Sequence, residues 1–317
     1  MWMRSESGRL LLTGADRRSY LQGLLTNDIE ALGPGMGCYA ALLTAQGRMV
    51  TDMRVAELGD AILMDLPAAV TDAVCAQLGR FIFSEDVQVT DVTKSRQEIG
   101  VYGPRGAEIL SRVMGTAVGV LRLHESVRLT FDDGHVIVIA SDLPGIAGFD
   151  LVVDAPSASS LRAALAAAGA EEATEDDTEA VRIESGIPRF GVDMDTDTIP
   201  LEAGIEDRAI SRTKGCYVGQ EVIIRVLDRG HGRVVRRLVG LDIDAEADVP
   251  APGAHVRAGD REVGRITSAV VSPALGRPIA LAYVHRDFTT PGTELTVSTA
   301  IPARVAALPF VAVGQHP

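Results

Sequence analysis

Residues that could do chemistry are concentrated in one short stretch of the sequence, from Lys214 to Glu221. It reads Lys-Gly-Cys-Tyr-Val-Gly-Gln-Glu, so it combines a thiol, an ammonium, an amide and a carboxylate with two glycines that permit a sharp turn. Arg212, Lys214 and Arg225 lie close to Cys216 in sequence, and nearby cations favour the thiolate form of a cysteine. Cys216 is therefore a candidate nucleophile or metal ligand, unless it is a small packed residue in a glycine turn.

We call this stretch the Cys216 loop; its candidate functional residues are Lys214, Gly215, Cys216, Tyr217, Gly219, Gln220 and Glu221. No Cys-x-x-Cys pair accompanies Cys216, and the nearest histidine after it, His231, is fifteen positions away. A closed zinc or cluster site within one chain is therefore not expected. The loop leads into a largely apolar run, residues 222–227, which must be buried on at least one side.

The Cys216 loop resembles the signature of the YgfZ family, the folate-binding proteins linked to iron-sulfur cluster assembly and repair. That family is related to the aminomethyltransferase (T-protein) of the glycine cleavage system. Further segments resemble these families in the same order along the chain: Asp16-Arg17, residues 20–23 and 26–28, residues 39–52, residues 182–191 and residues 200–204. The resemblance spans most of the chain, and its specific part is the loop.

The resemblance implies an α+β, aminomethyltransferase-like fold of three lobes. Two lobes are mixed α/β with antiparallel sheets, and the third is a C-terminal antiparallel β-barrel. The folate-binding core would cover residues 1–230 and the barrel residues 231–317. Within the core we expect two interleaved lobes, one from residues 1–50 with 140–230 and the other from residues 51–139.

Local patterns in the sequence predict several of these elements. Two strands, residues 38–43 and 49–55, are joined through Ala45-Gln46-Gly47 as a hairpin. A helix is predicted from Pro67 to about Gly79. Between residues 236 and 310, short strands alternate with Gly and Pro, which predicts a small antiparallel barrel.

The resemblance also implies that the chain binds tetrahydrofolate or a one-carbon derivative. Gly148-Phe149-Asp150 matches a Gly-x-Glu element that places a carboxylate against the two-donor edge of the pterin ring. The alternative is that Asp150 faces water at the end of a strand. Arg182 and Glu184 match an Arg-x-Glu-x-Gly element whose cation would hold the glutamate carboxylate of the folate. The alternative is that Arg182 forms an ion pair across its helix.

Asp52 is a further candidate for folate binding and for catalysis. The aminomethyltransferase relatives carry an acidic pair near this place, whereas this chain has Thr51-Asp52. One carboxylate is missing, so Asp52 holds either the catalytic position or the position next to it. The alternative is a solvent-side aspartate on an edge strand.

Three functions follow from these patterns. The first, implied by the resemblance, is a folate-binding accessory protein of iron-sulfur cluster assembly or repair, with iron-sulfur proteins or assembly factors as partners and a link to tRNA modification. The second is a folate-dependent one-carbon transferase of the aminomethyltransferase or demethylase type, in which Asp52 acts. The third is a binding module in which Cys216 is structural and a basic stretch, residues 212–237, binds RNA. Tyr217 is the only aromatic residue in that stretch, which argues against stacking on single-stranded nucleic acid.

Composition limits the classes of protein that fit. The chain has 317 residues and a net charge of −13, which suits two or three lobes and disfavours non-specific nucleic-acid binding. Residues 142–207 carry sixteen acids against three arginines, whereas residues 212–237 carry seven bases against two acids. The basic stretch could receive an acidic ligand, or it could balance the acidic segment before it.

No apolar run approaches a membrane span, no signal-peptide pattern is seen, and the three separated cysteines suit a reducing compartment, so we expect a cytoplasmic protein.

Overall fold

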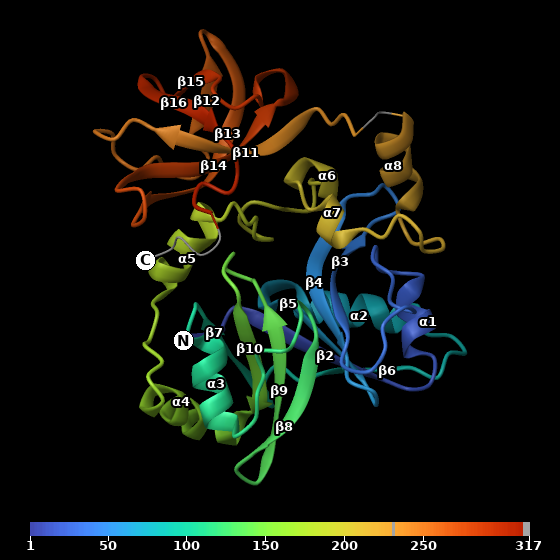
Figure 1. The fold of residues 1–317 in the computed structure, drawn as a ribbon. Coiled ribbons are helices and arrows are strands. Elements are labelled where there is room, and N and C mark those ends of the chain that lie inside the picture. The colour runs from blue at the N-terminus through green and yellow to red at the C-terminus, as the bar shows by residue number, and fades with distance from the viewer. Residues whose placement is uncertain (230–231, 313–317) are drawn as a thin grey trace.

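The computed structural model describes residues 1–229 and 232–312, and Figure 1 shows two sheet-based lobes beneath a barrel. The first sheet has the strand order β3-β4-β5-β2-β6. Its strands and helices are β2 (Ser7–Thr13), α1 (Arg17–Gln22), β3 (Gly37–Leu43), β4 (Met49–Glu57), β5 (Ile62–Pro67), η1 (Ala68–Val70), α2 (Thr71–Arg80) and β6 (Gln88–Asp91). Alternate strand residues such as Leu10 and Leu12 pack against Val74 and Leu78 of α2. The predicted hairpin is confirmed, and so is the helix predicted from Pro67, which η1 and α2 form.

The second sheet has the strand order β1-β7-β10-β9-β8. Its strands and helices are β1 (Trp2–Met3), β7 (Arg96–Tyr102), α3 (Gly106–Met114), β8 (Ser126–Phe131), β9 (Gly134–Ser141), β10 (Gly148–Asp154), η2 (Ala155–Ser157) and α4 (Ala158–Ala167). Its outer face packs against α3 and α4 through residues such as Ile99, Leu151 and Leu161. The two layers of this lobe are therefore a sheet and a pair of helices.

The sheets divide the chain differently from the grouping that we expected. Strands β4 and β5 belong with β3, because Ala41 pairs with Asp52 across the hairpin. Strand β10 instead pairs with β9 and β7 in the other sheet. The expected lobes, 1–50 with 140–230 and 51–139, would have separated strands that are hairpin neighbours, and neighbours in sequence usually pair.

The two sheets face each other across a small apolar contact. Ala56 and Leu63 of the first sheet pack against Ile137, Ile139 and Val152 of the second. Because paired residues of antiparallel strands point to the same side, Glu98, Tyr102 and Asp150 belong to this inner face as well. On the facing sheet, the same alternation puts Tyr39, Asp52 and Arg54 on the inner side. The polar residues of the core therefore meet beside its apolar contact.

The segment after the second sheet connects the core to the barrel. Its helical elements are α5 (Glu175–Glu184), α6 (Pro200–Ala203), α7 (Glu206–Ala209), α8 (Gln220–Ile224) and a π-helical turn (Arg225–Arg229). Helix α5 begins at a capping box in which Thr174 and Asp177 bond each other's backbone N–H groups. Ile183 of α5 packs against Leu238 and Leu281 of the barrel, so α5 fixes the barrel to the core.

The C-terminal part is a closed antiparallel barrel with the strand order β11-β14-β13-β12-β15-β16. Its elements are β11 (Arg236–Ile243), β12 (His255–Ala258), β13 (Arg261–Ser272), β14 (Arg277–His285), η4 (Arg286–Phe288), β15 (Glu294–Val297) and β16 (Ile301–Ala306). Leu241, Val256 and Ala282 fill its interior. The predicted α+β fold with a C-terminal barrel is confirmed, whereas His231 and the expected boundary between residues 230 and 231 lie outside the described residues. Across residues 1–229 and 232–312, every helix is too short or too polar to span a membrane.

Candidate functional site

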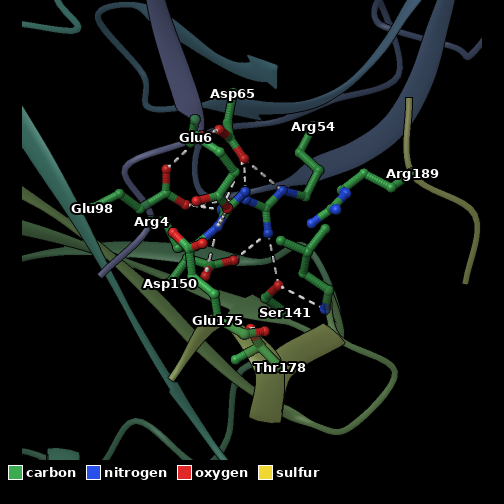
Figure 2. A network of polar contacts seen from close by, with 12 residues as sticks. Arg4, Glu6, Arg54, Asp65, Glu98, Ser141, Asp150, Glu175, Thr178 and Arg189 are labelled. Atoms are coloured by element: carbon green, nitrogen blue, oxygen red, sulfur yellow. Dashed lines mark hydrogen bonds and ion pairs between the residues drawn. The ribbon is translucent and has the colours of Figure 1, made fainter. Parts of the chain in front are cut away.

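A buried network of charges occupies the inner faces of the two sheets. Arg54 contacts Asp65 of its own sheet, and Glu98 at 3.0 Å and Asp150 of the facing sheet. Arg4 contacts the same carboxylates, with 3.1 Å between its Nη1 and Asp65. Figure 2 shows the Arg54 guanidinium between these carboxylates, with Ser141 as a further partner at 2.8 Å. The network joins the two lobes of the core.

The charges of this network are costly to bury. Arg4 and Glu98 are at least 94% buried, so each ion depends on its partners for the interactions it would make with water. Burial, opposed mainly by Arg4, raises the pKa of Glu98 to about 7. Burial also disfavours ionisation of Asp65, but Arg4 and Arg54 outweigh it and hold the pKa of Asp65 below its ordinary value. Removal of one member would leave an unpaired charge inside the core.

Asp150 lies in the centre of this network and is fully buried. Its Oδ2 accepts a hydrogen bond from Arg54, and its Oδ1 accepts one from the Tyr102 hydroxyl. The Tyr102 ring lies over Gly100, where any Cβ would overlap it. Asp150 therefore does not face water, and a pterin ring could reach its oxygens only by displacing Arg54 or Tyr102.

Asp52 lies on the same inner face but has fewer partners. The Tyr39 hydroxyl donates to Asp52 Oδ2 at 2.7 Å. The guanidinium carbon of Arg208 lies 5.4 Å from the centroid of the Tyr39 ring, a cation–π distance. Burial, partly offset by the Tyr39 hydrogen bond, raises the pKa of Asp52. Asp52 is on β4, an inner strand of its sheet, so the alternative of an edge-strand aspartate is wrong.

Two residues of the second lobe, Asp142 and His124, lie near Arg208, which in turn lies beside Tyr39. Arg208 forms an ion pair with Asp142 at 3.1 Å. His124 has a φ of 69°, which is uncommon for a residue other than glycine, and burial lowers its pKa to about 4. Asp142, Arg54 and Arg208 all act electrostatically on His124. We call Tyr39, Asp52, His124, Asp142 and Arg208 the Asp52 cluster.

Arg182 and Glu184 join α5 to the barrel. The Arg182 side chain bonds Glu179 at 2.7 Å, Asp193 at 2.6 Å and the Ser268 hydroxyl at 2.9 Å. Glu184 accepts from the Ser272 hydroxyl and from the Ala274 N–H at 3.0 Å. The ion pair expected as the alternative for Arg182 is present. The donors of Arg182 are already engaged by the protein, so both residues position the barrel.

The Cys216 loop is anchored at both ends and leaves the thiol exposed. Lys214 Nζ donates to the carbonyl oxygens of Gln22, Leu25 and Asn27 at 2.5–2.9 Å, just beyond the end of α1. Gly219 has a φ of 84°, and a Cβ on it would lie 2.5 Å from the Thr44 carbonyl oxygen. Cys216 itself is exposed. The alternative of a packed cysteine is therefore wrong.

The other loop residues divide between buried and exposed positions. Tyr217 is buried, and its ring centroid lies 5.1 Å from Lys214 Nζ. Gly215 is exposed with open space around it. Gln220 and Glu221 form the first turn of α8. Tyr217 and Lys214 thus fix the loop from below, while Gly215 and Cys216 stand at its surface.

Three of the seven bases in the basic stretch, Arg212, Arg236 and Arg237, pair with acids that precede it. Arg212 bonds Asp207 at 2.9 Å, and Arg237 bonds Glu206 at 3.2 Å. Arg208, just upstream, pairs with Asp142. This is the arrangement expected if the basic stretch balances the acidic segment, which was the alternative to an open anion-binding face.

Comparisons with known proteins identify the family. The model of the GCVT N-terminal domain matches residues 3–214, and the model of the glycine cleavage T-protein C-terminal barrel domain matches residues 236–312. The chain belongs to the glycine cleavage T-protein family. An aminomethyltransferase of Rubrobacter xylanophilus is 31% identical over 307 residues, covering 96% of this chain and 81% of the relative. One of Saccharopolyspora erythraea is 29% identical over 313 residues, covering 96% and 84%.

A solved structure agrees with this assignment at the level of the fold. The glycine cleavage system aminomethyltransferase T of Bartonella henselae superposes with a TM-score of 0.89 at 22% identity, covering 99% of this chain and 86% of the other. The T-protein fold of two sheet lobes and a barrel is therefore shared. The expected relation to the T-protein is confirmed, and membership of the YgfZ branch stays a prediction.

Five residues of the site were not predicted from the sequence: Tyr39, Arg54, Glu98, His124 and Arg208. The signal for two of them was charge within apolar strands, since Arg54 lies between Met53 and Val55, and Glu98 precedes Ile99. His124 lies in a loop and Arg208 in the short helix α7, where no pattern marks them. Among the residues that the structure describes, no group of three or more His, Cys, Asp and Glu is placed to hold a metal ion.

Proposed function

We propose that this chain is a folate-dependent one-carbon transferase that binds a reduced folate against the Asp52 cluster. The observation that carries the proposal is the state of Asp52, a carboxylate on the inner face of the core. Its Oδ2 accepts from Tyr39, while its Oδ1 accepts no hydrogen bond from another side chain in the described part of the chain. One oxygen is thus left for a ligand. Relatives named aminomethyltransferase support the same class of reaction.

The chemistry of the donor set fits a reduced folate at Asp52 and does not fit one at Asp150. A carboxylate with a raised pKa is a better proton acceptor, and the nitrogens of a reduced folate that carry a one-carbon unit must exchange protons. Arg208, beside Tyr39, supplies a cation for an acidic ligand. Asp150 has both oxygens bonded within the protein, so we assign no step to it. A bound tetrahydrofolate would supply the nitrogen that carries the one-carbon unit.

Calorimetric titration with tetrahydrofolate tests this proposal. We expect the wild-type chain to bind, and Asp52→Asn to weaken binding by about 1.5–3 kcal/mol, the usual value of a hydrogen bond to a charged group. Asp60→Asn is the matched control, because Asp60 is an exposed aspartate in the turn after β4 and should leave affinity unchanged. Equal affinity for the wild type and Asp52→Asn would remove Asp52 from the site.

A second candidate function rests on the exposed thiol of Cys216. We propose that the chain acts in iron-sulfur cluster assembly or repair, as the YgfZ resemblance implies, and that the Cys216 loop meets an iron-sulfur protein or an assembly factor. The anchoring of the loop by Lys214 and Gly219 supports a contact role, since it holds the thiol at the surface. The free cysteines suit the cytoplasm.

Cys216→Ala separates the two candidates. If the thiol serves a partner, the variant binds tetrahydrofolate as the wild type does but fails to restore the activity of iron-sulfur enzymes in cells that lack the protein. Full restoration by Cys216→Ala would leave the transferase as the better account. Loss of folate binding in the variant would instead make the thiol part of the folate site.

A further inference from the structure

A cavity of about 490 Å³ lies between the barrel and the segment that links α5 to α6. One wall comes from Asp193, Asp195 and Thr198 of this linker, and the other from Arg236, Tyr283 and His285 of the barrel. Figure 1 shows the linker passing beside β11 and β14. The cavity is separate from the Asp52 cluster, since none of its lining residues belongs to that cluster.

The barrel wall presents hydrogen-bond donors. Arg236 pairs with His285 across β11 and β14, so both side chains stand on the same face of the barrel, and Tyr283, two residues before His285, shares that face. The Arg236 guanidinium lies 4.6 Å from the centroid of the Tyr283 ring. Its Nε bonds Glu202 at 3.2 Å, which leaves its terminal nitrogens for a ligand. His285 Nδ1 accepts from the Asp287 N–H, so in the neutral ring Nε2 carries the hydrogen.

The Tyr283 hydroxyl is the second observation that points to a ligand. Tyr283 is 94% buried, and within the described residues its hydroxyl makes no hydrogen bond. The Thr198 oxygen lies beside it, with its hydrogen donated to Asp195 at 2.8 Å, and acts on the Tyr283 hydroxyl without forming a hydrogen bond of normal geometry with it. A buried donor without a partner costs free energy, and a ligand that accepts from it would recover that cost.

The acids of the linker wall are already bonded. Asp193 accepts from Arg182 and Ser268, both at 2.6 Å. Asp195 Oδ1 accepts from Thr198 and from the Asp197 N–H at 2.9 Å. The barrel wall also carries the acid Glu262, which is paired with His255 and Arg265, so the donors left towards the cavity are the terminal nitrogens of Arg236 and the Tyr283 hydroxyl. A wall of this kind favours an anion with acceptor oxygens.

We propose that this cavity binds a small carboxylate, held by Arg236 and the Tyr283 hydroxyl. A carboxylate offers two coplanar acceptor oxygens, which match the planar fork of an arginine and leave lone pairs for a tyrosine hydroxyl. The carboxylate belongs either to a free acid or to the glutamyl tail of a folate. The second source rests on the proposed folate binding, and the first does not.

Titration of the full chain with L-glutamate as the probe tests the site without any folate. We expect saturable binding, weakened about tenfold or more in Tyr283→Phe, since that variant keeps the ring and removes only the donor. Arg236→Gln should weaken binding as strongly. Arg237→Gln is the matched control, because Arg237 bonds Glu206 at 3.2 Å just as Arg236 bonds Glu202, yet does not line the cavity.

The two sources are separated by tetrahydrofolate with one or with three glutamates. A tail in the cavity makes the triglutamate bind more tightly than the monoglutamate, and Tyr283→Phe abolishes the difference. The proposal is overturned if neither glutamate nor the longer tail responds to Tyr283→Phe, or if Arg237→Gln weakens binding as much as Arg236→Gln. Binding of glutamate without binding of any folate would support the cavity and contradict the proposed function.

Discussion

Two aspartates on facing strands show how far the surroundings decide the use of a carboxylate. Asp150 is fully buried with both oxygens bonded by Arg54 and Tyr102, whereas Asp52 has one partner, Tyr39. The sequence placed both in a folate site because both match family elements. It could not separate them, because Arg54, which bonds the Asp150 carboxylate, lies on a strand about a hundred positions away.

Asp150→Asn should therefore act on stability. The substitution removes the negative charge that faces Arg54, so a buried guanidinium loses a partner, and we expect the free energy of unfolding to fall by about 3–5 kcal/mol. Urea denaturation measures this change. Asp52→Asn, which breaks no ion pair, is the matched variant and should cost clearly less; equal losses for the two variants would contradict the account of the network.

His124 should make stability depend on acidity. Burial lowers its pKa from 6.5 to about 4, so between these values the unfolded chain binds a proton that the folded chain does not. The contribution of His124 to the free energy of unfolding is therefore fully present above pH 6.5, and it is lost as the pH drops towards 4. In His124→Asn this part of the decline should be absent, and asparagine tolerates the positive φ.

Denaturation series between pH 4 and pH 7 test this expectation. His135→Asn serves as the control, because His135 is an exposed histidine on the neighbouring strand β9. Its decline with falling pH should match that of the wild type. An identical decline in His124→Asn would mean that His124 ionises as easily in the folded chain as in the unfolded one.

At the scale of elements, the Cys216 loop is held by the hairpin of β3 and β4. A Cβ on Gly47 would lie 3.0 Å from Val222, and one on Gly219 would lie 2.5 Å from the Thr44 carbonyl oxygen. The two glycines thus allow the hairpin turn and the loop to touch. The sequence predicted that the loop glycines permit a sharp turn, but it could not name the neighbour, which is some 170 positions away.

Gly219→Ala should weaken this contact. The φ of 84° is unfavourable for alanine and the new methyl group meets backbone atoms, so we expect a loss of about 1–3 kcal/mol of unfolding free energy. Gly215→Ala is the control, since its φ is not in the left-handed region and nothing lies within 4 Å of its Cβ. Thermal melts should show a lower Tm for Gly219→Ala alone. A similar change in both variants would show that the loop is not anchored as described.

Prediction from sequence succeeded for elements whose pattern is local. Alternation and turn residues gave the hairpin of residues 38–55, and repeated short strands gave the barrel. Helix α1 ends at Gln22 although apolar residues continue to Leu25, because Leu25 leaves the helix to bridge Leu42. The partition of strands between two sheets failed, since it depends on long-range pairing that no local pattern encodes.

At the scale of the whole molecule, buried polar contacts join the two sheets to each other and the barrel to the core. Arg54 and Glu98 join the sheets, and Arg182 and Glu184 join α5 to the barrel. Family membership and the fold follow from the comparisons, whereas the use of the interior does not. We propose that Asp52, and not Asp150, meets the ligand.

A crystal structure of the chain grown with tetrahydrofolate tests this claim most directly. The account predicts a folate nitrogen within hydrogen-bond distance of Asp52 Oδ1, with Asp150 still bonded to Arg54 and Tyr102. A pterin ring on the Asp150 carboxylate, with Arg54 turned away from it, would contradict the account. So would a ligand-free interior in crystals grown with an excess of tetrahydrofolate.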